Sequence, residues 1–258
     1  MMNRFVMKCG GSTLAALPDR FYEGLKRLQA VGAQPVIVHG GGPAINETLA
    51  KLGIESRFVN GLRVTTEPVL DVVEMVLAGQ INKAIVQRLQ AVGAQAMGIS
   101  GTDGGLLTAK PVANSDEIGF VGQVTAVKTA MIDEVCRMGY IPVIAPLGID
   151  ASGQRYNINA DTAAGAVTAA LGAERLVMVT DVPGILRDGK LLPLVTVAEV
   201  EAMIASGEIY GGMIPKVKAA LDCLAGGVDE VVIVGGKEPD VLAWVLGGDS
   251  VGTRVRIA

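Results

Sequence analysis

Short β-branched segments alternate with helical segments along the whole chain, and this alternation constrains the fold more strongly than any other feature. Strand-like segments, short and rich in Val and Ile, occur at residues 4–8, 35–39, 94–100, 141–145, 175–180 and 230–234. Between them, apolar residues recur with helical spacing, as at Phe21, Leu25 and Leu28, at Val69, Val72, Val73, Val76 and Leu77, and at Met213, Val217, Ala220, Leu221 and Leu224. Strands joined through helices form βαβ units, so the sequence predicts an α/β protein with a parallel sheet.

The composition is that of a globular protein with an acidic balance. The chain has 258 residues, half of them hydrophobic, which is enough for one large α/β domain or two small ones. With a net charge of −4 and few aromatic residues, it offers no basic face for nucleic acid, which we do not expect as a partner. Polar residues interrupt the longest uncharged segment, 28–46, and the N-terminal residues do not resemble a secretory signal. We therefore expect no membrane helix and a cytoplasmic location.

The few cysteines and the single histidine restrict the possible chemistry. Cys9, Cys136 and Cys223 are odd in number and far apart, so we expect reduced, mostly buried thiols without a disulfide framework or CxxC metal site. A Ser-His-Asp triad or a multi-histidine metal site would have to be built around His39, the only histidine. Chemistry that needs no imidazole is therefore favoured, and no protein metal site is expected.

Two glycine-rich turns follow the first two predicted strands. The first strand ends at Lys8, followed by Gly10 and Gly11, and the second runs into three glycines at 40–42 and then Pro43. In open parallel sheets, ligands bind beyond the carboxyl ends of the strands, where glycine N–H groups suit phosphate oxygens. Each turn also has a plain interpretation, as a tight βα connection or a lysine facing solvent. Together they favour an anion site with a cation beside it.

The common nucleotide-binding motifs do not account for these glycines. The dinucleotide fingerprint GxGxxG/A fails because Ile45 stands at its last required position. A P-loop spacing at 184–190 is followed by Leu191 where Ser or Thr is needed, and no helical pattern begins there. Neither of the two commonest nucleotide-binding folds is supported.

Two predicted helix starts carry polar residues that suit a phosphate ligand. Asn159 or Asp161 can cap the alanine-rich helix that follows, or can act in the site. Lys216 and Lys218 lie near another helix start, where positive charge is disfavoured unless an anion is bound. Both lysines could also simply face solvent.

Two hairpins are predicted outside the alternating pattern. Asn60-Gly61 lies between two strand-like pieces at 57–64, and this dipeptide is the strongest short hairpin signal. A second hairpin is predicted at 119–125, with less clear turn chemistry. Hairpins on a parallel fold commonly line or cover a site, so both are candidate lids.

Six motifs, in order over essentially the whole chain, resemble the amino acid kinase family. They are Lys8-x-Gly10-Gly11, His39-Gly-Gly-Gly42, Asn60-Gly-Leu-Arg63-Val-Thr65, Asn157-x-Asn159-Ala-Asp161, Asp181-Val-x-Gly184-Ile-Leu186 and Gly212-Met-x-x-Lys216. The resemblance implies one amino acid kinase domain over residues 1–258, folded as an open three-layer αβα sandwich with a mainly parallel central sheet. It also implies that 1–150 is the lobe that binds the acyl amino acid and 151–258 the lobe that binds ATP.

The resemblance implies an activity as well. The Asn60 to Thr65 motif is similar to that of the branch of the family that transfers a phosphoryl group from ATP to the side-chain carboxylate of N-acetyl-L-glutamate, in arginine biosynthesis. Mg²⁺ is expected to accompany ATP and to be held mainly by the nucleotide phosphates.

The resemblance assigns roles to residues at the matching positions of this sequence. Those implied at the transferring phosphoryl group are Lys8, Lys216, Asp161, Gly11 and Gly41, with Asp161 positioning both lysines. Those implied to bind the acyl amino acid are Gly41, Gly42, Arg63, Asn157 and Asn159, although Asn159 could serve only as a helix cap. Those implied to bind the nucleotide are Gly10, Gly11, Asp181, Val182, Gly184, Ile185, Leu186, Tyr210 and Gly212.

Assembly and regulation are also expected from the family. Members that arginine inhibits carry an additional N-terminal helix, whereas the first predicted strand here begins close to Met1. We therefore expect a homodimer, joined through residues 67–93, that arginine does not inhibit. Two alternatives are a kinase of N-acetyl-aminoadipate or of another substrate of the amino acid kinase family, and a catalytically silent nucleotide-binding sensor. The Asn60 to Thr65 motif argues against the first, and the presence of Lys8, Asp161 and Lys216 argues against the second.

Overall fold

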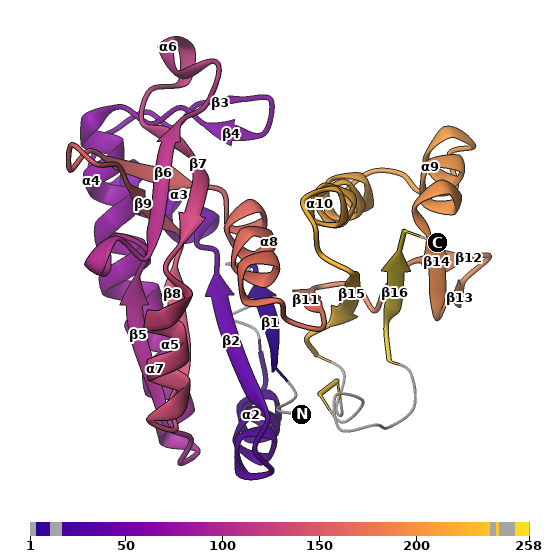
Figure 1. The fold of residues 1–258 in the computed structure, drawn as a ribbon. Helices are drawn as coiled ribbons and strands as arrows, with labels where there is room; N and C mark the ends of the chain where they lie inside the picture. The colour runs from indigo at the N-terminus through magenta and orange to yellow at the C-terminus, as the bar shows by residue number, and fades with distance from the viewer. Residues whose placement is uncertain (1–3, 11–16, 238–240, 243–250, 258) are drawn as a thin grey trace.

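A mostly parallel eight-stranded sheet organises the molecule (Figure 1). The computed structural model describes residues 4–10, 17–237, 241–242 and 251–257. Within them, the sheet has the strand order β14-β16-β15-β11-β1-β2-β8-β5, and every neighbouring pair is parallel except β15 and β16. Helices cover both faces, so the three-layer α/β architecture predicted from the sequence is confirmed.

The eight strands include all six that the sequence predicts. They are β1 (Arg4–Cys9), β2 (Gln34–His39), β5 (Ala96–Ser100), β8 (Ile141–Ala145), β11 (Leu176–Thr180), β14 (Leu194–Thr196), β15 (Glu230–Gly235) and β16 (Thr253–Arg256). Successive residues of a strand enter different cores: Val36 and Val38 of β2 belong to one apolar cluster and Ile37 to the other. Burial on both faces explains why β2, β8, β11 and β15 are nearly continuous apolar segments in the sequence.

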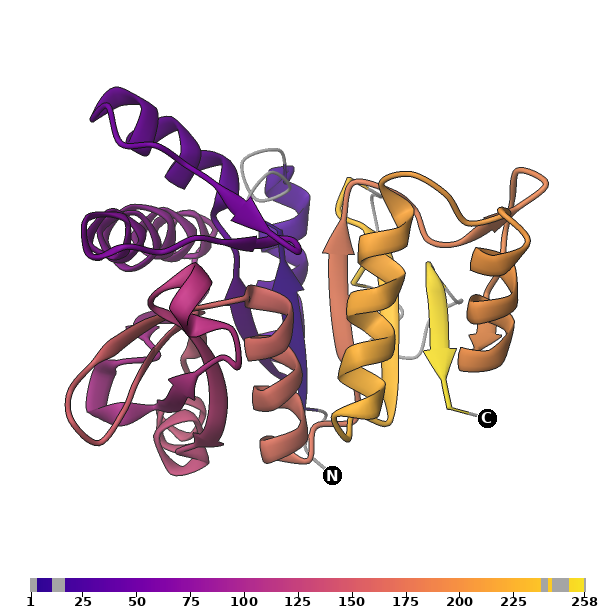
Figure 2. The same cartoon turned by 90° about the horizontal axis from the view of Figure 1, so that it is seen from above.

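The helices form one layer on each face of the sheet. On one face lie α2 (Asp19–Ala30) and α5 (Asn82–Ala91), where the predicted stripe of Phe21, Leu25 and Leu28 is buried. On the other face lie α7 (Thr129–Arg137), α8 (Ala160–Leu171), α9 (Val197–Ala205) and α10 (Met213–Ala225). Figure 2 shows α8 and α10 side by side over the middle of the sheet.

A second helical group lies near the carboxyl ends of β2 and β8. It consists of α3 (Gly42–Lys51), α4 (Glu67–Glu74) and a π-helical segment, η1 (Met75–Ile81), which continues into α5. Their apolar faces share one cluster, which includes Leu49, Val73 and Leu77. The helix predicted from the valine stripe at 69–76 is therefore present as α4. It continues without a break into the π-helical segment η1 and then into α5.

A small closed barrel stands beside the sheet and was not predicted. It contains β6 (Leu107–Pro111), β7 (Val121–Val127), β9 (Leu147–Ile149) and β10 (Arg155–Ile158), with η2 (Asp103–Gly105) before β6 and α6 (Ser115–Ile118) between β6 and β7. The hairpin predicted at 119–125 is wrong, because 121–127 is one uninterrupted strand. Gly122 does not turn the chain: a Cβ there would lie 2.6 Å from Cβ of Tyr156, so glycine permits close packing of β7 on β10.

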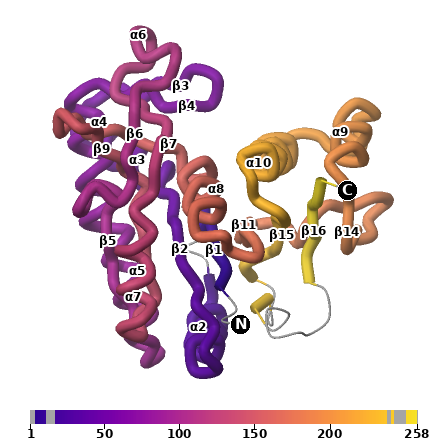
Figure 3. The backbone as a smooth tube through the Cα atoms, in the orientation of Figure 1, coloured from indigo at the N-terminus to yellow at the C-terminus, as the bar shows by residue number. Residues whose placement is uncertain are grey.

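The hairpin predicted at 57–64 is confirmed. It consists of β3 (Phe58–Val59) and β4 (Leu62–Arg63), with positive φ at both Asn60 and Gly61, as a type I′ turn requires. The tube in Figure 3 shows this hairpin close to the end of the barrel that carries α6. A second hairpin, β12 (Leu186–Arg187) and β13 (Lys190–Leu191), occupies the segment with P-loop spacing. That segment therefore forms no P-loop.

The remaining expectations about the chain differ in outcome. All three cysteines are buried free thiols, as predicted. No helix among the described residues is long and apolar enough to span a membrane. The division into lobes at residue 150 stays a prediction, since β10 and α8 follow that position but pack with the barrel and with β1 and β2.

Candidate active site

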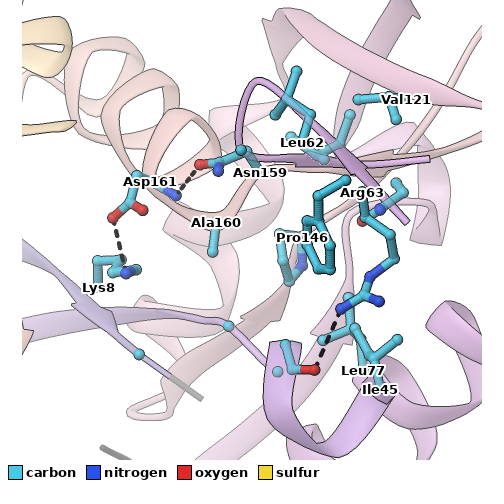
Figure 4. A pocket seen from close by; sticks show the side chains of 18 residues that line it. Lys8, Ile45, Leu62, Arg63, Leu77, Val121, Pro146, Asn159, Ala160 and Asp161 are labelled. Carbon is cyan, nitrogen blue, oxygen red and sulfur yellow. Dashed lines mark hydrogen bonds and ion pairs between the residues drawn. The ribbon is translucent and has the colours of Figure 1, made fainter. Parts of the chain in front are cut away.

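One cavity of about 230 Å³ opens at the carboxyl edge of the sheet (Figure 4). It is bounded by the turns after β1, β2 and β8, by the β3–β4 hairpin and by the start of α8. Its lining includes Lys8, Gly10, Gly40, Gly41, Gly42, Ile45, Phe58, Leu62, Arg63, Leu77, Val121, Pro146, Asn157, Asn159, Ala160 and Asp161. Eight of the residues assigned to the site from the sequence therefore meet in one place. Gly11 lies outside the described residues.

The glycine turn after β2 brings main-chain donors to the cavity. Gly41 is the N-cap of α3, which carries Pro43 in its first turn and which no described side chain caps. The first N–H groups of such a helix have no partner within the helix and can bind a ligand anion. A Cβ at Gly41 would lie 2.5 Å from Leu77 and 2.6 Å from Ile81, so the π-helical segment leaves no room for a side chain. A side chain at residue 41 would therefore force the terminal methyl groups of Leu77 and Ile81 to move.

Lys8 enters the cavity from the end of β1. It lies on the same face of the strand as Val6, toward α8, and its side chain is 16% exposed. Its ammonium is 2.9 Å from Oδ1 of Asp161, an ion pair whose angles do not make an aligned hydrogen bond (Figure 4). Asp161 thus holds the cation while its own oxygen keeps unused hydrogen-bonding capacity.

Asn159, and not Asp161, caps α8. Its Oδ1 accepts hydrogen bonds from the N–H groups of Asp161, at 2.8 Å, and of Thr162, at 3.2 Å. Asp161 therefore stands in the first turn with its carboxylate directed at Lys8 (Figure 4). Of the alternatives that the sequence left open, the capping role belongs to Asn159, which also lines the cavity. Whether it contacts a ligand stays a prediction.

Arg63 places a buried cation at another part of the cavity. Its side chain donates to Oδ1 of Asn46 at 2.7 Å, to Oγ of Ser56 at 2.5 Å and to the carbonyl of Gly42 at 3.3 Å, and it stacks over Phe58. Among the described residues, no carboxylate pairs with it, although the residue is only 7% exposed. Burial lowers the pKa of this guanidinium from its usual value. A buried guanidinium with only neutral acceptors is suited to a carboxylate ligand.

Lys216 lies near the start of α10, outside the cavity. Its ammonium is 2.6 Å from Oδ1 of Asp181, which follows β11, the strand next to β1. The expectation that Asp161 positions both lysines is therefore not what the structure contains: each lysine has its own aspartate. The Lys216 ammonium holds the pKa of the Asp181 carboxyl below its ordinary value. Both lysines nevertheless lie at the carboxyl edge of the sheet, Lys8 near the end of β1 and Lys216 beside the residue that follows β11.

Apart from Gly10, which lines the cavity, and Gly11, the residues assigned to the nucleotide lie at the start of α10 or in the loop and hairpin after β11. Gly212 is the N-cap of α10, whose first turn contains no acidic residue and whose start is not capped by any side chain that the structure describes. Ile185 is buried and its N–H donates to Oγ1 of Thr253, whereas Leu186 and Tyr210 are exposed. Asp181, Val182 and Gly184 form the connecting loop, and none of these residues lines the 230 Å³ cavity. An uncapped helix start beside Lys216 fits the phosphates of a nucleotide.

His39 has a structural position at the end of β2. It is fully buried, its Nδ1 donates to the carbonyl of Gly40 at 3.1 Å, and its Nε2 accepts from Nδ2 of Asn82 at 3.2 Å. Burial lowers the pKa of His39 from 6.5 to about 4. A neutral imidazole with both nitrogens bonded does not act as a proton shuttle, in agreement with the expectation that the chemistry needs no imidazole.

The low pKa of His39 makes the folded protein sensitive to acid. Between pH 6.5 and about 4 the unfolded chain binds a proton that folded His39 does not, so stability falls as pH falls through this window. We expect His39→Gln to abolish this contribution, which amounts to at most about 3 kcal/mol at one pKa unit per 1.36 kcal/mol. Urea unfolding of both proteins across the window measures it. Equal losses of stability in the two would contradict the prediction.

Sequence reasoning gave no role to several residues around the cavity. The side chains of Leu77 and Ile81 occupy the space that a Cβ at Gly41 would need, and the hydroxyl of Thr65 accepts a hydrogen bond from Asn157. A signal was present for Thr65, since a polar residue directly after the hairpin belonged to a quoted motif. No local signal identified Leu77 or Ile81, because both look like ordinary members of a helical stripe.

A mostly parallel sheet between two helical layers carries at its carboxyl edge glycine turns, two lysines and two helix starts that no described side chain caps. This is the arrangement of a phosphate-binding α/β protein of the phosphotransferase type. The sequence profile of the amino acid kinase family matches residues 3–235. The chain belongs to the amino acid kinase family.

Individual relatives are similar over nearly the whole chain. The sequence is 53% identical over 232 residues to an acetylglutamate kinase of Geobacillus kaustophilus (strain HTA426), covering 90% of each protein. It is 48% identical over 251 residues to an acetylglutamate kinase of Halalkalibacterium halodurans, covering 97% of this chain and 95% of that one. Among solved structures, smu.665 from Streptococcus mutans UA159 aligns with a TM-score of 0.86 and 32% identity over all of both chains.

Proposed function

We propose that this protein transfers the terminal phosphoryl group of ATP to the side-chain carboxylate of N-acetyl-L-glutamate, giving N-acetyl-L-glutamyl 5-phosphate for arginine biosynthesis. The observation that carries the proposal is the cavity lined by both the Lys8–Asp161 pair and Arg63, a buried cation without a carboxylate partner among the described residues. A ligand with two carboxylates can place one of them near Lys8 and the other near Arg63. Relatives that are 48–53% identical over most of the chain carry the name of this activity.

The proposed chemistry suits the residues present. A glutamate side chain has a pKa near ~4.3 and is already ionised at neutral pH, so the nucleophile needs no general base. The harder task is to bring this anion against a phosphoryl group whose negative charge is spread over its oxygens. Lys8, Lys216 and the N–H of Gly41 supply positive charge and donors for those oxygens, while Asp161 keeps the Lys8 ammonium in place. Bound ATP, with Mg²⁺ held mainly by its phosphates, supplies the group that is transferred.

The binding roles follow the lining of the cavity. Arg63 holds the α-carboxylate with its planar fork, and Asn157 binds the acetamido group, with Gly42 nearby. The nucleotide is proposed to lie over the start of α10 and the loop after β11. In this arrangement residues 1–150 provide most of the acyl amino acid site and 151–258 the ATP site.

An ATP-dependent hydroxamate assay tests the proposal. Hydroxylamine traps an acyl phosphate, so we expect hydroxamate from N-acetyl-L-glutamate and ATP, and none when either is omitted. N-acetyl-aminoadipate is the comparison substrate, because one additional methylene is worth only ~1 to 3 kcal/mol of discrimination. A preference for the longer substrate would replace the proposed one, and binding of ATP without any hydroxamate would indicate a silent sensor.

Arg63→Lys tests how the α-carboxylate binds. A lysine keeps the positive charge but loses the bidentate fork and the contacts to Asn46 and Ser56. We expect the KM for N-acetyl-L-glutamate to rise about 10- to 100-fold, as for loss of a charged hydrogen bond, with a smaller change in kcat. The KM for ATP is the internal control. An unchanged KM for N-acetyl-L-glutamate would mean that the α-carboxylate binds elsewhere.

Assembly, regulation and location complete the proposal. We propose a homodimer joined through residues 67–93, the α4–η1–α5 region, in which Met75 is 56% exposed. Light scattering of the purified protein measures the mass. Activity that arginine does not inhibit stays a prediction, and kinetic assays with added arginine test it. A cytoplasmic location belongs to the same proposal, because ATP is a cytoplasmic substrate.

A further inference from the structure

Thr65 lies between two residues to which the proposed function gives binding roles. It follows the β3–β4 hairpin and is completely buried. Its N–H donates to the carbonyl of Ile118 at 2.8 Å, and its own carbonyl accepts from the N–H of Phe120 at 2.8 Å. The main chain of Thr65 is therefore attached to the connection between α6 and β7, and its side chain starts from a fixed position.

The hydroxyl of Thr65 makes two contacts. Its Oγ1 donates to the carbonyl of Arg63 at 2.8 Å. Nδ2 of Asn157 donates to the same Oγ1 at 3.1 Å. A hydroxyl has one hydrogen, and a carbonyl can only accept, so the contact to Arg63 uses the only hydrogen that Thr65 has. Toward Asn157, Thr65 can only accept.

This hydrogen-bond accounting determines how the Asn157 amide is oriented. Because Thr65 can only accept from Asn157, the NH₂ group must face Thr65 and the carbonyl oxygen must face away from it. In the described part of the chain, that oxygen has no hydrogen-bond partner, and Asn157 lines the cavity. The second hydrogen of Nδ2 also remains for other contacts. A ligand with an amide N–H therefore meets an acceptor whose orientation is set before it binds.

We propose that Thr65 is a positioning residue for the acyl amino acid: one buried hydroxyl holds the main chain of Arg63 and the amide of Asn157 in a single arrangement. The inference rests on the proposed function, because it assumes that these two residues bind the same ligand. Thr65 does not line the cavity and touches no reacting atom. Its effect reaches the ligand only through its two partners.

Thr65→Val and Thr65→Ser test this role. Valine keeps the shape of threonine but offers no hydrogen bond, whereas serine keeps the hydroxyl. We expect Thr65→Val to raise the KM for N-acetyl-L-glutamate about tenfold, as for leaving a polar partner without its hydrogen bond. The KM for ATP should stay unchanged, and kcat should change less than the KM. Thr65→Ser should restore most of the affinity, and calorimetric titration with N-acetyl-L-glutamate alone should give the same order.

Two further variants separate positioning from folding. Thr168 is also a buried threonine whose hydroxyl donates to a main-chain carbonyl, that of Ala164 at 2.7 Å, but it lies within α8 away from the cavity. Thr168→Val should leave both KM values unchanged, even where stability falls. In an Asn157→Ala background, Thr65→Val should raise the KM less than it does alone, because the two residues act as a unit.

The outcomes distinguish this role from the proposed function. Wild-type protein without hydroxamate formation from N-acetyl-L-glutamate would overturn both. An active wild type would leave the proposed function standing, and three results would then overturn the role of Thr65 alone. They are an unchanged KM in Thr65→Val, equal rises in the KM for both substrates, and a Thr65→Ser variant as impaired as Thr65→Val.

Discussion

Lys8→Ala should lower kcat by about 100- to 1000-fold, the usual loss when one preorganised donor to developing negative charge is removed. Lys8 is 16% exposed and is held by Asp161 at the end of β1, so its ammonium needs little reorganisation to meet a phosphoryl group. Alanine leaves β1 intact, since the neighbouring core residues Met7 and Cys9 point to the opposite face. Steady-state rates with saturating substrates measure the effect, and thermal unfolding should show a small change by comparison.

Lys51→Ala is the matched control for Lys8. Lys51 ends α3 and is exposed, and within the described part of the chain it pairs only with Glu47 one turn earlier, so its removal should change neither kcat nor stability appreciably. Near-normal turnover in Lys8→Ala would remove Lys8 from the catalytic role. A large loss of stability with normal specific activity of the folded fraction would give it a structural role instead.

The parts of this fold that local sequence could predict are those whose cause is local. β2, β8, β11 and β15 are buried on both faces, which makes each a short, mainly apolar segment in the sequence. The turn at Asn60-Gly61 needs positive φ at two successive residues, and few other dipeptides tolerate this. Both features are visible without knowledge of the rest of the chain.

The barrel could not be predicted in this way because its pairing is nonlocal. β10 pairs with β7 in parallel and with β9 in antiparallel orientation, and β6 with β9 in parallel, so the strand order does not follow a hairpin pattern. Gly119 and Gly122 suggested a turn at 119–125. Gly122 instead allows close packing against Tyr156, which no neighbouring residue in the sequence reveals.

The candidate active site shows the same contrast between features with a local cause, which could be predicted, and features with a nonlocal cause, which could not. The turns that contain Gly10 and 40–42 were predicted to meet at one edge, because consecutive parallel strands end there, and the structure brings both to the cavity. The positioning of Lys216 by Asp161 stays a prediction, whereas the structure pairs Lys216 with Asp181 instead. Which aspartate pairs with Lys216 depends on how α10 packs relative to β11 and α8. Asp181 follows β11 and Asp161 lies in the first turn of α8, so both carboxylates are at the same edge of the sheet. A motif indicates which charged residues lie at one site, but it does not indicate which of them form ion pairs with one another.

Asp161→Asn should lower kcat by about 100-fold or more while leaving the fold intact. Asparagine has the shape of aspartate but no charge, so the Lys8 ammonium loses the ion pair that holds it in the cavity. Capping of α8 should persist, because Asn159 supplies it. Removing an acidic group from the first turn of a helix costs only about 0.3 to 1 kcal/mol of stability. Paired measurements of kcat and of urea unfolding should therefore show a large change in the first and a small change in the second.

Glu199→Gln gives the opposite comparison. Glu199 is also an acidic residue in the first turn of a helix, α9, where it completes a capping box with Thr196 far from the cavity lining. Its replacement should lower stability slightly, because glutamine still fits the capping box but loses the favourable negative charge at the helix start, and it should leave kcat unchanged. If Asp161→Asn behaved like Glu199→Gln, with reduced stability and normal turnover, Asp161 would be a helix residue only. Phosphoryl transfer would then not depend on the Lys8–Asp161 ion pair, because the Lys8 ammonium would act equally well beside a neutral side chain.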